Sequence, residues 1–332
     1  MRADMDFKNK KWLFLAPLAG YTDLPFRSVV KKFGVDVTTS EMVSSHSLVY
    51  AFDKTFKMLE KSPLEDHFMA QISGSKEGVV KEAVEKINAL EHVSGIDFNC
   101  GCPAPKVANH GNGSGLLKDL NHLVKLLKII RENTNKKITS VKVRLGFEKK
   151  IPKEIAHALN DAPVDYVVVH GRTRSDKYQK DKIDYESIAL MKKILKKPVI
   201  ANGEIDSVKK AFEVLQITQA DGLMIGRAAL RAPWIFWQIR NNTTKLPAVV
   251  KKDLVLEHFD KMVEFYGDRG VVMFRKNLHA YAKGEMQASA FRNCVNTLTE
   301  IKSMREGIEE FFNQEMLQSE VPLWVELNQK SV

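Results

Sequence analysis

The chain has 332 residues, 44% of them hydrophobic, and carries a formal net charge of +10. That length accommodates one large domain and a smaller one. No apolar stretch approaches the roughly 20 residues of a membrane-spanning helix, and three cysteines are too few for a disulfide framework, so we expect a cytoplasmic protein with no membrane partner.

Eight short apolar runs, taken in chain order, predict β-strands. They cover residues 13–16, 35–40, 68–71, 95–99, 140–145, 166–170, 199–202 and 222–225. Amphipathic segments between them predict helices, among them residues 79–90, 122–130, 188–195 and 208–215. Alternating strands and helices imply a parallel sheet with right-handed crossovers. Eight repeats that close on themselves form a (β/α)8 TIM barrel, with a doubly wound open sheet as the alternative.

The strand signal disappears after the eighth run. The polar segment 241–247 ends in Pro247 and predicts a linker. Beyond it, residues 254–266, 271–281 and 288–304 have helical spacing. We therefore predict two domains, a catalytic barrel over residues 1–240 and an all-helical domain over residues 250–332. The glycine-rich segment 111–115 lacks the spacing of a dinucleotide-binding fingerprint, and we interpret it as a flexible loop.

The positive charge is unevenly distributed along the chain. Residues 241 onward hold 12 basic and 13 acidic side chains, so the excess lies in the first 240 residues, often in pairs such as Lys136-Lys137 and Lys196-Lys197. This balance favours a polyanionic partner, because Lys and Arg release counterions from phosphate groups. The alternative is a surface kept soluble by the lysines of a Lys-rich organism, and composition leaves both open.

Polar or glycine residues follow most of the predicted strands, where a TIM barrel has its active site. They are Pro17 to Gly20, Gln71, Asn99, Arg144, His170, Asn202 with Gly203, and Gly226 with Arg227. Side-chain amides carry both donors and acceptors, which suits the edge of a flavin or a pyrimidine. Gly226 allows close backbone approach, and Arg227 suits a phosphate. Each residue alone has a structural interpretation, and the second strand leads to Glu41, to which we assign no role.

Lys142 and Arg144 place two cations at alternate positions of one buried strand, where such residues need partners. One interpretation places the Lys142 ammonium near the N1–O2 edge of a reduced flavin, where a positive charge tunes the cofactor. The other interpretation is a structural ion pair between Lys142 and either Asp97 or Glu41. Both stay open.

Cys102 lies between Gly101 and Pro103 in a predicted turn. A thiol with the ordinary pKa of about 8.5 is mostly protonated at neutral pH and can donate a proton. The alternative is a small buried apolar side chain. We expect no metal site, because metal-binding cysteine pairs usually have a longer spacing and a second ligand pair, whereas the remaining cysteine is the distant Cys294.

Together these segments resemble the tRNA-dihydrouridine synthase family, most closely its bacterial B-type branch. The matching segments are residues 16–20, 22–23, 25–27, 71, 97–103, 141–146, 170–174, 202–205, 226–227, 233–234 and 274–276. They follow the family's order over residues 12 to about 240, and the last segment resembles its C-terminal helical domain. The departures are Cys100, Ala228, Arg231 and Asn277, where the family often has Met, Gly, Gly and His.

The resemblance implies an enzyme that binds FMN at the mouth of the barrel, takes electrons from NADPH and reduces the C5=C6 bond of particular uridines in tRNA. It implies that uracil C6 receives a hydride from the flavin and that Cys102 protonates C5. The implied FMN contacts are Pro17, Leu18, Ala19, Gln71, Lys142, His170, Asn202, Gly203, Glu204, Gly226 and Arg227. Asn99 and Arg144 fall where the uracil would lie. Arg275 and Lys276 are candidate phosphate contacts, with an ordinary solvated helix face as the alternative.

Two other functions stay open. One is a flavin barrel that acts on a free pyrimidine, as a dihydroorotate dehydrogenase does, although the basic surface and the helical module argue against it. The other is a non-catalytic RNA-binding chaperone that has kept a flavin barrel. No obligate protein partner is evident.

Overall fold

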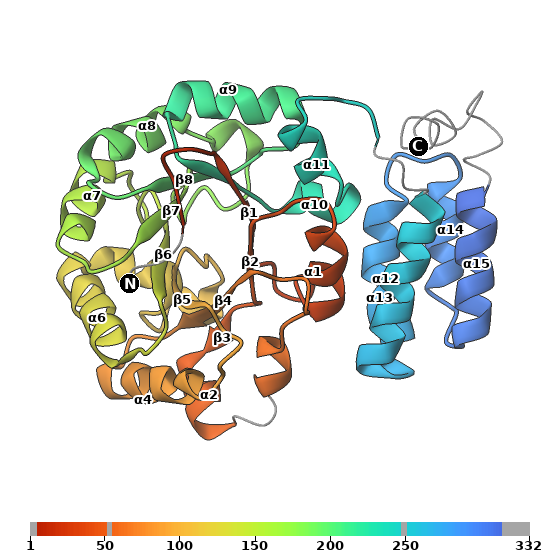
Figure 1. Ribbon diagram of the computed structural model, residues 1–332, viewed down its shortest axis with the longest axis horizontal. Helices are drawn as coiled ribbons and strands as arrows, with labels where there is room; N and C mark the ends of the chain where they lie inside the picture. The colour runs from red at the N-terminus through yellow and green to blue at the C-terminus, as the bar shows by residue number, and fades with distance from the viewer. Residues whose placement is uncertain (1–4, 52–54, 247–250, 314–332) are drawn as a thin grey trace. The chain divides into compact units, whose positions relative to one another are not determined.

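The computed structural model describes residues 5–51, 55–246 and 251–313, and within them eight parallel strands form a closed barrel (Figure 1). The barrel strands are β1 (Trp12–Leu15), β2 (Val37–Thr39), β4 (His67–Ser73), β5 (Gly95–Cys100), β6 (Ile138–Arg144), β7 (Tyr166–His170), β8 (Val199–Asn202) and β9 (Gly222–Ile225). β1 pairs with β2 and β9, and β2 pairs with β4, so the ring has no open edge. The short strand β3 (Val43–Ser44) adds to β4. The predicted TIM barrel is confirmed, and the open-sheet alternative is wrong.

The interior of the barrel is filled by every second residue of its strands, because successive side chains of a strand point to opposite faces. One buried cluster contains Trp12, Phe14, Ala16, Val37, Met69, Ile138, Tyr166, Val168, Ile200 and Met224. Following the same alternation toward the carboxyl ends of the strands leads to polar residues. Met69 is followed by Gln71, and Ile200 by Asn202. The barrel therefore has an apolar lower layer and a polar upper layer.

Helices surround the barrel strands, as Figure 1 shows. They are α4 (Glu77–Asn88), α6 (Leu120–Asn133), α7 (Pro152–Asn160), α8 (Tyr185–Ile194) and α9 (Val208–Thr218), and shorter segments are α2 (Ser45–Tyr50), α5 (Pro105–Ala108), η1 (Lys57–Leu59) and η3 (Lys180–Lys182). α4 buries Val80, Ala83, Val84 and Ile87, the spacing of one helical face. The sequence placed this helix at residues 79–90, two residues too far along the chain.

The glycine-rich segment is not an open loop. Residues Gly113–Lys118 form the 3-10 helix η2, in which residues 113–117 are buried. A Cβ atom at Gly115 would lie 2.5 Å from the carbonyl oxygen of Ala108. The loop interpretation is wrong for these residues, because the glycine is required by close packing against α5 and not by flexibility.

Three lysines that lie just before barrel strands donate hydrogen bonds to backbone carbonyl groups in the segments that follow helices. Lys11 Nζ donates to Ala220 O at 2.8 Å, Lys136 Nζ to Leu90 O at 2.7 Å, and Lys197 Nζ to Ala162 O at 2.6 Å. An ammonium group satisfies carbonyl groups that would otherwise lack partners at such ends. Part of the positive charge therefore has a structural role.

The chain divides into two compact units, Met1–Leu24 with Val35–Gly226, and Pro25–Gly34 with Arg227–Val332. The first unit contains the barrel. The second contains most of α1 (Leu24–Lys31), together with α10 (Arg227–Arg231) and α11 (Ile235–Arg240). The predicted boundaries at residues 240 and 250 stay a prediction. Residues 241–246 form neither helix nor strand, and Pro247 lies outside the described residues.

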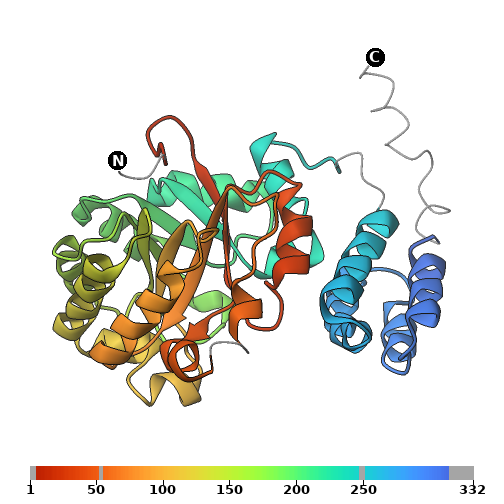
Figure 2. The same cartoon turned by 60° about the horizontal axis from the view of Figure 1, so that its bottom comes forward.

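Four further helices of the second unit form a bundle (Figure 2). They are α12 (Lys251–Tyr266), α13 (Arg269–Tyr281), α14 (Ala288–Val295) and α15 (Ile301–Asn313), and Phe259, Phe274, Phe291 and Phe312 are in their common core. The single helix predicted over residues 288–304 is wrong, because the helix is interrupted between α14 and α15. Thr297 Oγ1 donates to Cys294 O at 2.8 Å there, a local bond that competes with the helical pattern.

Candidate active site at the carboxyl ends of the barrel strands

Six of the polar residues predicted at strand ends lie in the upper layer of the barrel. They are Gln71 on β4, Asn99 on β5, Lys142 and Arg144 on β6, His170 on β7 and Asn202 on β8. Strand pairing sets Asn99 beside Lys142, Arg144 beside His170, and His170 beside Asn202. All six are less than a tenth exposed. The structure therefore brings these residues together.

A chain of hydrogen bonds crosses from the barrel interior to the Cys102 turn. Asp97 Oδ1 accepts from Ser140 Oγ at 2.6 Å, and Asp97 Oδ2 accepts from Gln71 Nε2 at 2.6 Å. Gln71 Oε1 accepts from Asn99 Nδ2 at 2.8 Å. Asn99 Oδ1 then accepts from the backbone N–H of Cys102 at 2.9 Å. Burial raises the pKa of Asp97, while the bonds from Gln71 and Ser140 oppose that shift.

Cys102 is held by its backbone and keeps its side chain accessible. Its carbonyl oxygen accepts from Ser114 Oγ at 2.7 Å. Cys102 is half-buried, whereas Cys100 is buried completely, and burial raises the pKa of the Cys100 thiol well above its usual value. Of the two, only Cys102 can therefore present its thiol to a ligand at the barrel mouth.

Lys142 is bonded to an amide and not to a carboxylate. Its Nζ donates to Asn202 Oδ1 at 2.9 Å, and Asn202 Nδ2 donates to Met224 O at 2.8 Å. Among the described residues no carboxylate lies within ion-pair distance of Lys142 Nζ, and Glu41 instead accepts from the backbone N–H of Gly20. The alternative interpretation, a structural ion pair of Lys142 with Asp97 or Glu41, is therefore wrong. Burial, and next the nearby Arg144, lower the pKa of Lys142 to about 8.

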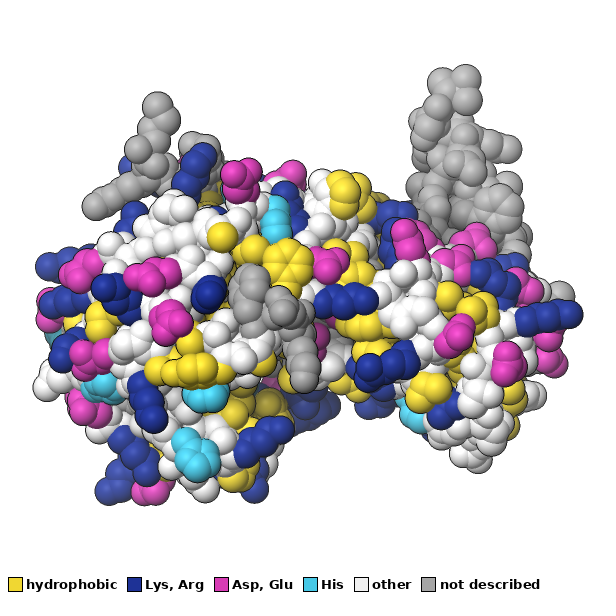
Figure 3. Space-filling model, turned by 90° about the horizontal axis from the view of Figure 1, so that it is seen from below, with side chains coloured by type: hydrophobic (Ala, Val, Ile, Leu, Met, Phe, Trp, Pro, Cys, Tyr) yellow, Lys and Arg dark blue, Asp and Glu magenta, His cyan; other side chains and the backbone are white. Residues whose placement is uncertain are grey.

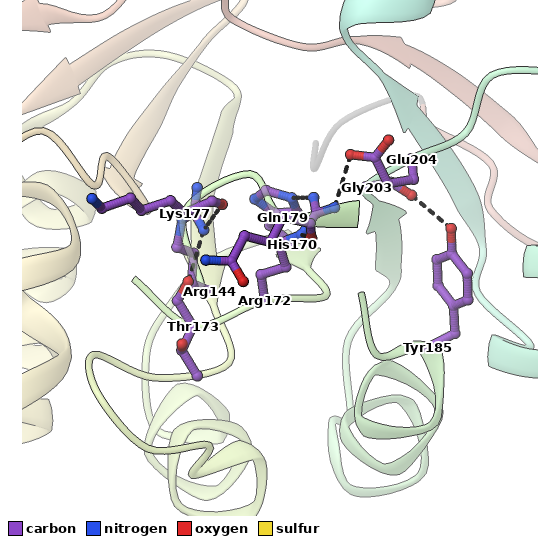
Figure 4. A network of polar contacts seen from close by, with 9 residues as sticks. All are labelled: Arg144, His170, Arg172, Thr173, Lys177, Gln179, Tyr185, Gly203 and Glu204. Carbon is purple, nitrogen blue, oxygen red and sulfur yellow. Dashed lines mark hydrogen bonds and ion pairs between the residues drawn. The ribbon is translucent and has the colours of Figure 1, made fainter. Parts of the chain in front are cut away.

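Arg144 links the loops that follow β5 and β7. Its Nε donates to Gly101 O at 2.7 Å. Its Nη1 donates to Thr173 O at 2.8 Å and to Lys177 O at 3.0 Å (Figure 4). The side chain is 2% exposed, and burial lowers its pKa to about 10. Arg144 therefore orders the rim of the site through backbone acceptors. Its contact with a substrate stays a prediction.

Arg172 connects residues in the neighbouring part of the rim, although no role was predicted for it from the sequence. Its Nη2 forms an ion pair with Glu204 Oε1 at 2.8 Å, and its Nη1 lies 3.2 Å from His170 Nε2 (Figure 4). Its Nε donates to Gln179 O at 2.7 Å. Because a guanidinium can only donate, His170 Nε2 is the acceptor in this contact. Continuing the strand alternation from His170 by two residues would have identified Arg172.

Gly203 allows the strand-end loop of β8 to approach this network. Its φ is +126°, and a Cβ atom there would lie 2.4 Å from Ile183 Cδ1 and 3.0 Å from His170 Cδ2. Tyr185 Oη donates to Gly203 O at 2.8 Å (Figure 4). The positive φ and these close neighbours require glycine at this position. His170 and Glu204 both contact Arg172, so the predicted residues His170, Gly203 and Glu204 lie together.

The first and last strands of the barrel also bring predicted residues together. The backbone N–H of Ala16 donates to Ile225 O at 2.8 Å, and a Cβ atom at Gly226 would lie 3.4 Å from Ala16 Cβ and 3.6 Å from Leu18. The segment Pro17–Ala19 therefore runs beside Gly226. Arg227 is the first residue of α10.

Arg275 and Lys276 lie on α13, where both are partly shielded from solvent. Both are half-buried, and Arg275 Nη2 donates to Leu298 O at 2.6 Å in the turn between α14 and α15. Asn277, the departure from the family pattern, is 3% exposed. One role of Arg275 is therefore to stabilise that turn, and phosphate binding by Arg275 and Lys276 stays a prediction.

Comparisons with family models and with related sequences agree on a single family. A family model described as dihydrouridine synthase matches residues 14–319. A probable tRNA-dihydrouridine synthase of Helicobacter pylori strain ATCC 700392 / 26695 is 98% identical over 328 residues, which cover 99% of this chain and 100% of that protein. The tRNA-dihydrouridine synthase B of Pseudomonas syringae pv. tomato is 36% identical over 312 residues, 91% of each chain.

A solved structure of a 2-naphthoyl-CoA reductase resembles the fold, with a TM-score of 0.54 and 10% sequence identity. The similarity covers 70% of this chain and 50% of that one. At this identity the likeness concerns the fold alone. In the described part of the chain, no helix has the length and apolar character needed to cross a bilayer.

Proposed function

The chain belongs to the dihydrouridine synthase family, and on that premise we propose that it reduces the C5=C6 bond of specific uridines in tRNA. One observation carries the proposal: a ring of buried amides and cations adjoins a single accessible thiol whose backbone is fixed on both sides. Such an arrangement suits a reaction in which a flat heterocycle is gripped and one proton is delivered.

The donor set at the barrel mouth fits FMN. Lys142 provides a buried cation among the side-chain amides of Gln71, Asn99 and Asn202, which matches the alternating donors and acceptors of an isoalloxazine edge. Gly203 and Gly226, with Pro17, Leu18 and Ala19 beside them, would hold the rest of the cofactor with His170, Glu204 and Arg227. When bound, FMN would supply the hydride for uracil C6, with NADPH as the source of electrons.

The protein's own residues would orient the base and move one proton. Cys102 Sγ would hold the proton that uracil C5 receives. The position of Cys102 is fixed because its backbone N–H and C=O groups are both hydrogen-bonded. Asn99 and Arg144 would border the uracil. A uridine within folded RNA must first be unstacked and turned outward, and a barrel mouth can receive such a base.

The helical region over residues 250–332 would bind the body of the tRNA, with Arg275 and Lys276 near phosphates. On the face drawn in Figure 3, Lys and Arg side chains are scattered among Asp and Glu and do not form one patch. Recognition of RNA by shape requires dispersed phosphate contacts more than base reading, which is consistent with this distribution. We place the reaction in the cytoplasm, where tRNA is available.

The test uses purified protein reconstituted with FMN, NADPH and tRNA from cells that lack the gene. Mass spectrometry should find uridines that gain two hydrogens. Cys102→Ala should retain FMN and tRNA binding and lose this product. Turnover of free orotate without tRNA reduction would instead favour the dihydroorotate-dehydrogenase-like alternative, and tRNA binding without product in the unmodified protein would favour the chaperone alternative.

A further inference from the structure

We propose that Asp97 is the positioning residue that orients the Cys102 turn, acting through the side-chain amides of Gln71 and Asn99. The significance of that turn for proton transfer rests on the proposed function. The positioning itself is a property of the hydrogen bonds and can be tested separately.

The bonds in this chain run in one direction between two fixed ends: Asp97 accepts at the interior end, and the backbone N–H groups of Gly101 and Cys102 donate at the turn. Both carboxylate oxygens of Asp97 accept, one from Ser140 and the other from Gln71, so Gln71 turns its Nε2 toward Asp97, with which it forms a 2.6 Å bond. Gln71 Oε1 then faces Asn99, which must present Nδ2, at 2.8 Å. Asn99 Oδ1 is left facing the turn. Two side-chain amides that could each adopt either of two orientations are thereby restricted to one.

The turn depends on that outcome. Asn99 Oδ1 accepts from the backbone N–H of Cys102 at 2.9 Å and from that of Gly101 at 3.2 Å. If the Asn99 amide were reversed, its NH2 group would face two other donors, and both N–H groups would lose their acceptor. The carbonyl side of the turn has independent support from Ser114 and Arg144. Only the N–H side is controlled by Asp97.

Asp97 is suited to set this direction because it is buried and bonded on both sides. It is 2% exposed, and both carboxylate oxygens are bonded to residues on the two neighbouring strands. Its other partner, Ser140, has a hydroxyl that rotates and can donate or accept, so Ser140 imposes no direction. At the interior end of the chain, the direction is therefore set by Asp97 and not by Ser140.

The test measures the alkylation rate of Cys102 by iodoacetamide in a Cys294→Ser background, which removes the exposed thiol and leaves the buried Cys100 unreactive. Asp97→Ala leaves a polar cavity that water can fill, and water can donate or accept in any direction. We expect alkylation roughly threefold to tenfold faster, the equivalent of one lost net hydrogen bond. Asp97→Asn can keep its Oδ1 toward Gln71 while Ser140 accepts from its Nδ2, so this conservative variant should stay within about twofold of the parent.

Ser140→Ala is the matched control, since it removes the other bond to Asp97 and should leave the alkylation rate unchanged. If Asp97→Ala fails to fold, Gln71→Met interrupts the same chain one residue further along and should accelerate alkylation to the same extent. An unchanged rate in a folded Asp97→Ala or Gln71→Met variant would overturn the proposal, as would equal acceleration in Ser140→Ala. These rates are measured without tRNA, so they do not depend on whether Cys102→Ala abolishes dihydrouridine formation.

Discussion

The lower and upper layers of the barrel interior follow the same alternation of side chains along the strands, but they differ in the kind of contact that their side chains make. In the lower layer, side chains such as Phe14, Met69 and Ile200 pack into one apolar cluster with no direction to their contacts. In the upper layer, polar side chains form specific hydrogen bonds, such as those of Asp97 with Gln71 and of Lys142 with Asn202. The comparison shows that one strand can bury apolar side chains at its beginning and hold hydrogen-bonded polar side chains at its end. The two layers should therefore respond differently to substitution.

The largest expected effect is on activity and lies in the upper layer. Cys102→Ala should lower the rate of dihydrouridine formation by about 10²- to 10⁴-fold, the usual contribution of a positioned acid. Its thermal stability should change little, because the side chain is half-buried and its turn is held by backbone bonds. Single-turnover kinetics with FMN-loaded protein would measure the rate, and Cys294→Ser is the matched control. Full activity of Cys102→Ala would contradict the acid role.

The corresponding substitution in the lower layer should change stability and not cofactor binding. Phe14 is fully buried in the apolar cluster, so Phe14→Ala should lower the free energy of unfolding by about 3–5 kcal/mol. Below its lower melting temperature the variant should still bind FMN, because the cavity lies beneath the polar ring. Urea denaturation and flavin titration would measure the two quantities. Loss of FMN binding in a folded Phe14→Ala variant would show that the layers are not separable.

A smaller effect is expected for the affinity of the upper layer for its cofactor. Lys142→Met preserves an unbranched apolar stem and removes the charge. It should weaken FMN binding roughly tenfold to a hundredfold, as expected for the loss of a charge-assisted hydrogen bond. Fluorescence titration of FMN measures this change. Wild-type affinity would contradict the placement of Lys142 at the cofactor.

Lys142 also predicts a pH dependence. Its pKa is lowered to about 8 in the folded protein, against about 10.4 in an unfolded chain. Between these two values the unfolded state binds more protons, so the FMN-free protein should gain stability as the pH rises through this window. FMN favours the ammonium form, so FMN affinity should fall as the pH rises above about 8. The comparison of wild type with Lys142→Met isolates both slopes, and equal slopes would contradict the assignment.

The smallest effect tests the lysines at the opposite end of the barrel. Lys197 Nζ donates to Leu159, Asn160 and Ala162 carbonyls, whereas its neighbour Lys196 is exposed. Lys197→Met should cost about 1–2 kcal/mol of unfolding free energy, and Lys196→Met less than about 0.5 kcal/mol. Chemical denaturation of both variants measures the difference. Equal effects would mean that the carbonyl contacts of Lys197 contribute nothing to stability.

Much of the architecture was predictable because its signals are local. The ranges 166–170, 199–202 and 222–225 coincide with β7, β8 and β9, since short apolar runs between polar turns identify buried strands. The separation of α14 from α15 was missed because the break contains no proline or glycine and depends on Thr297 and its neighbours. The packing of Gly115 was missed because its reason, the carbonyl of Ala108, is not visible in the spacing of the glycines.

By itself, the sequence determined the α/β barrel and the polar residues at the strand ends, and it led to the prediction that Cys102 is the reactive thiol, because periodicity and strand-end position are properties of neighbouring residues. Only the tertiary structure decided the partners: that Lys142 bonds Asn202 across 60 residues, that Gln71 bonds Asp97 across 26, and that Arg144 bonds backbone carbonyls. The physical reason is that a polar side chain can be satisfied equally well by many acceptors, and only closure of the barrel selects which of them lies within reach.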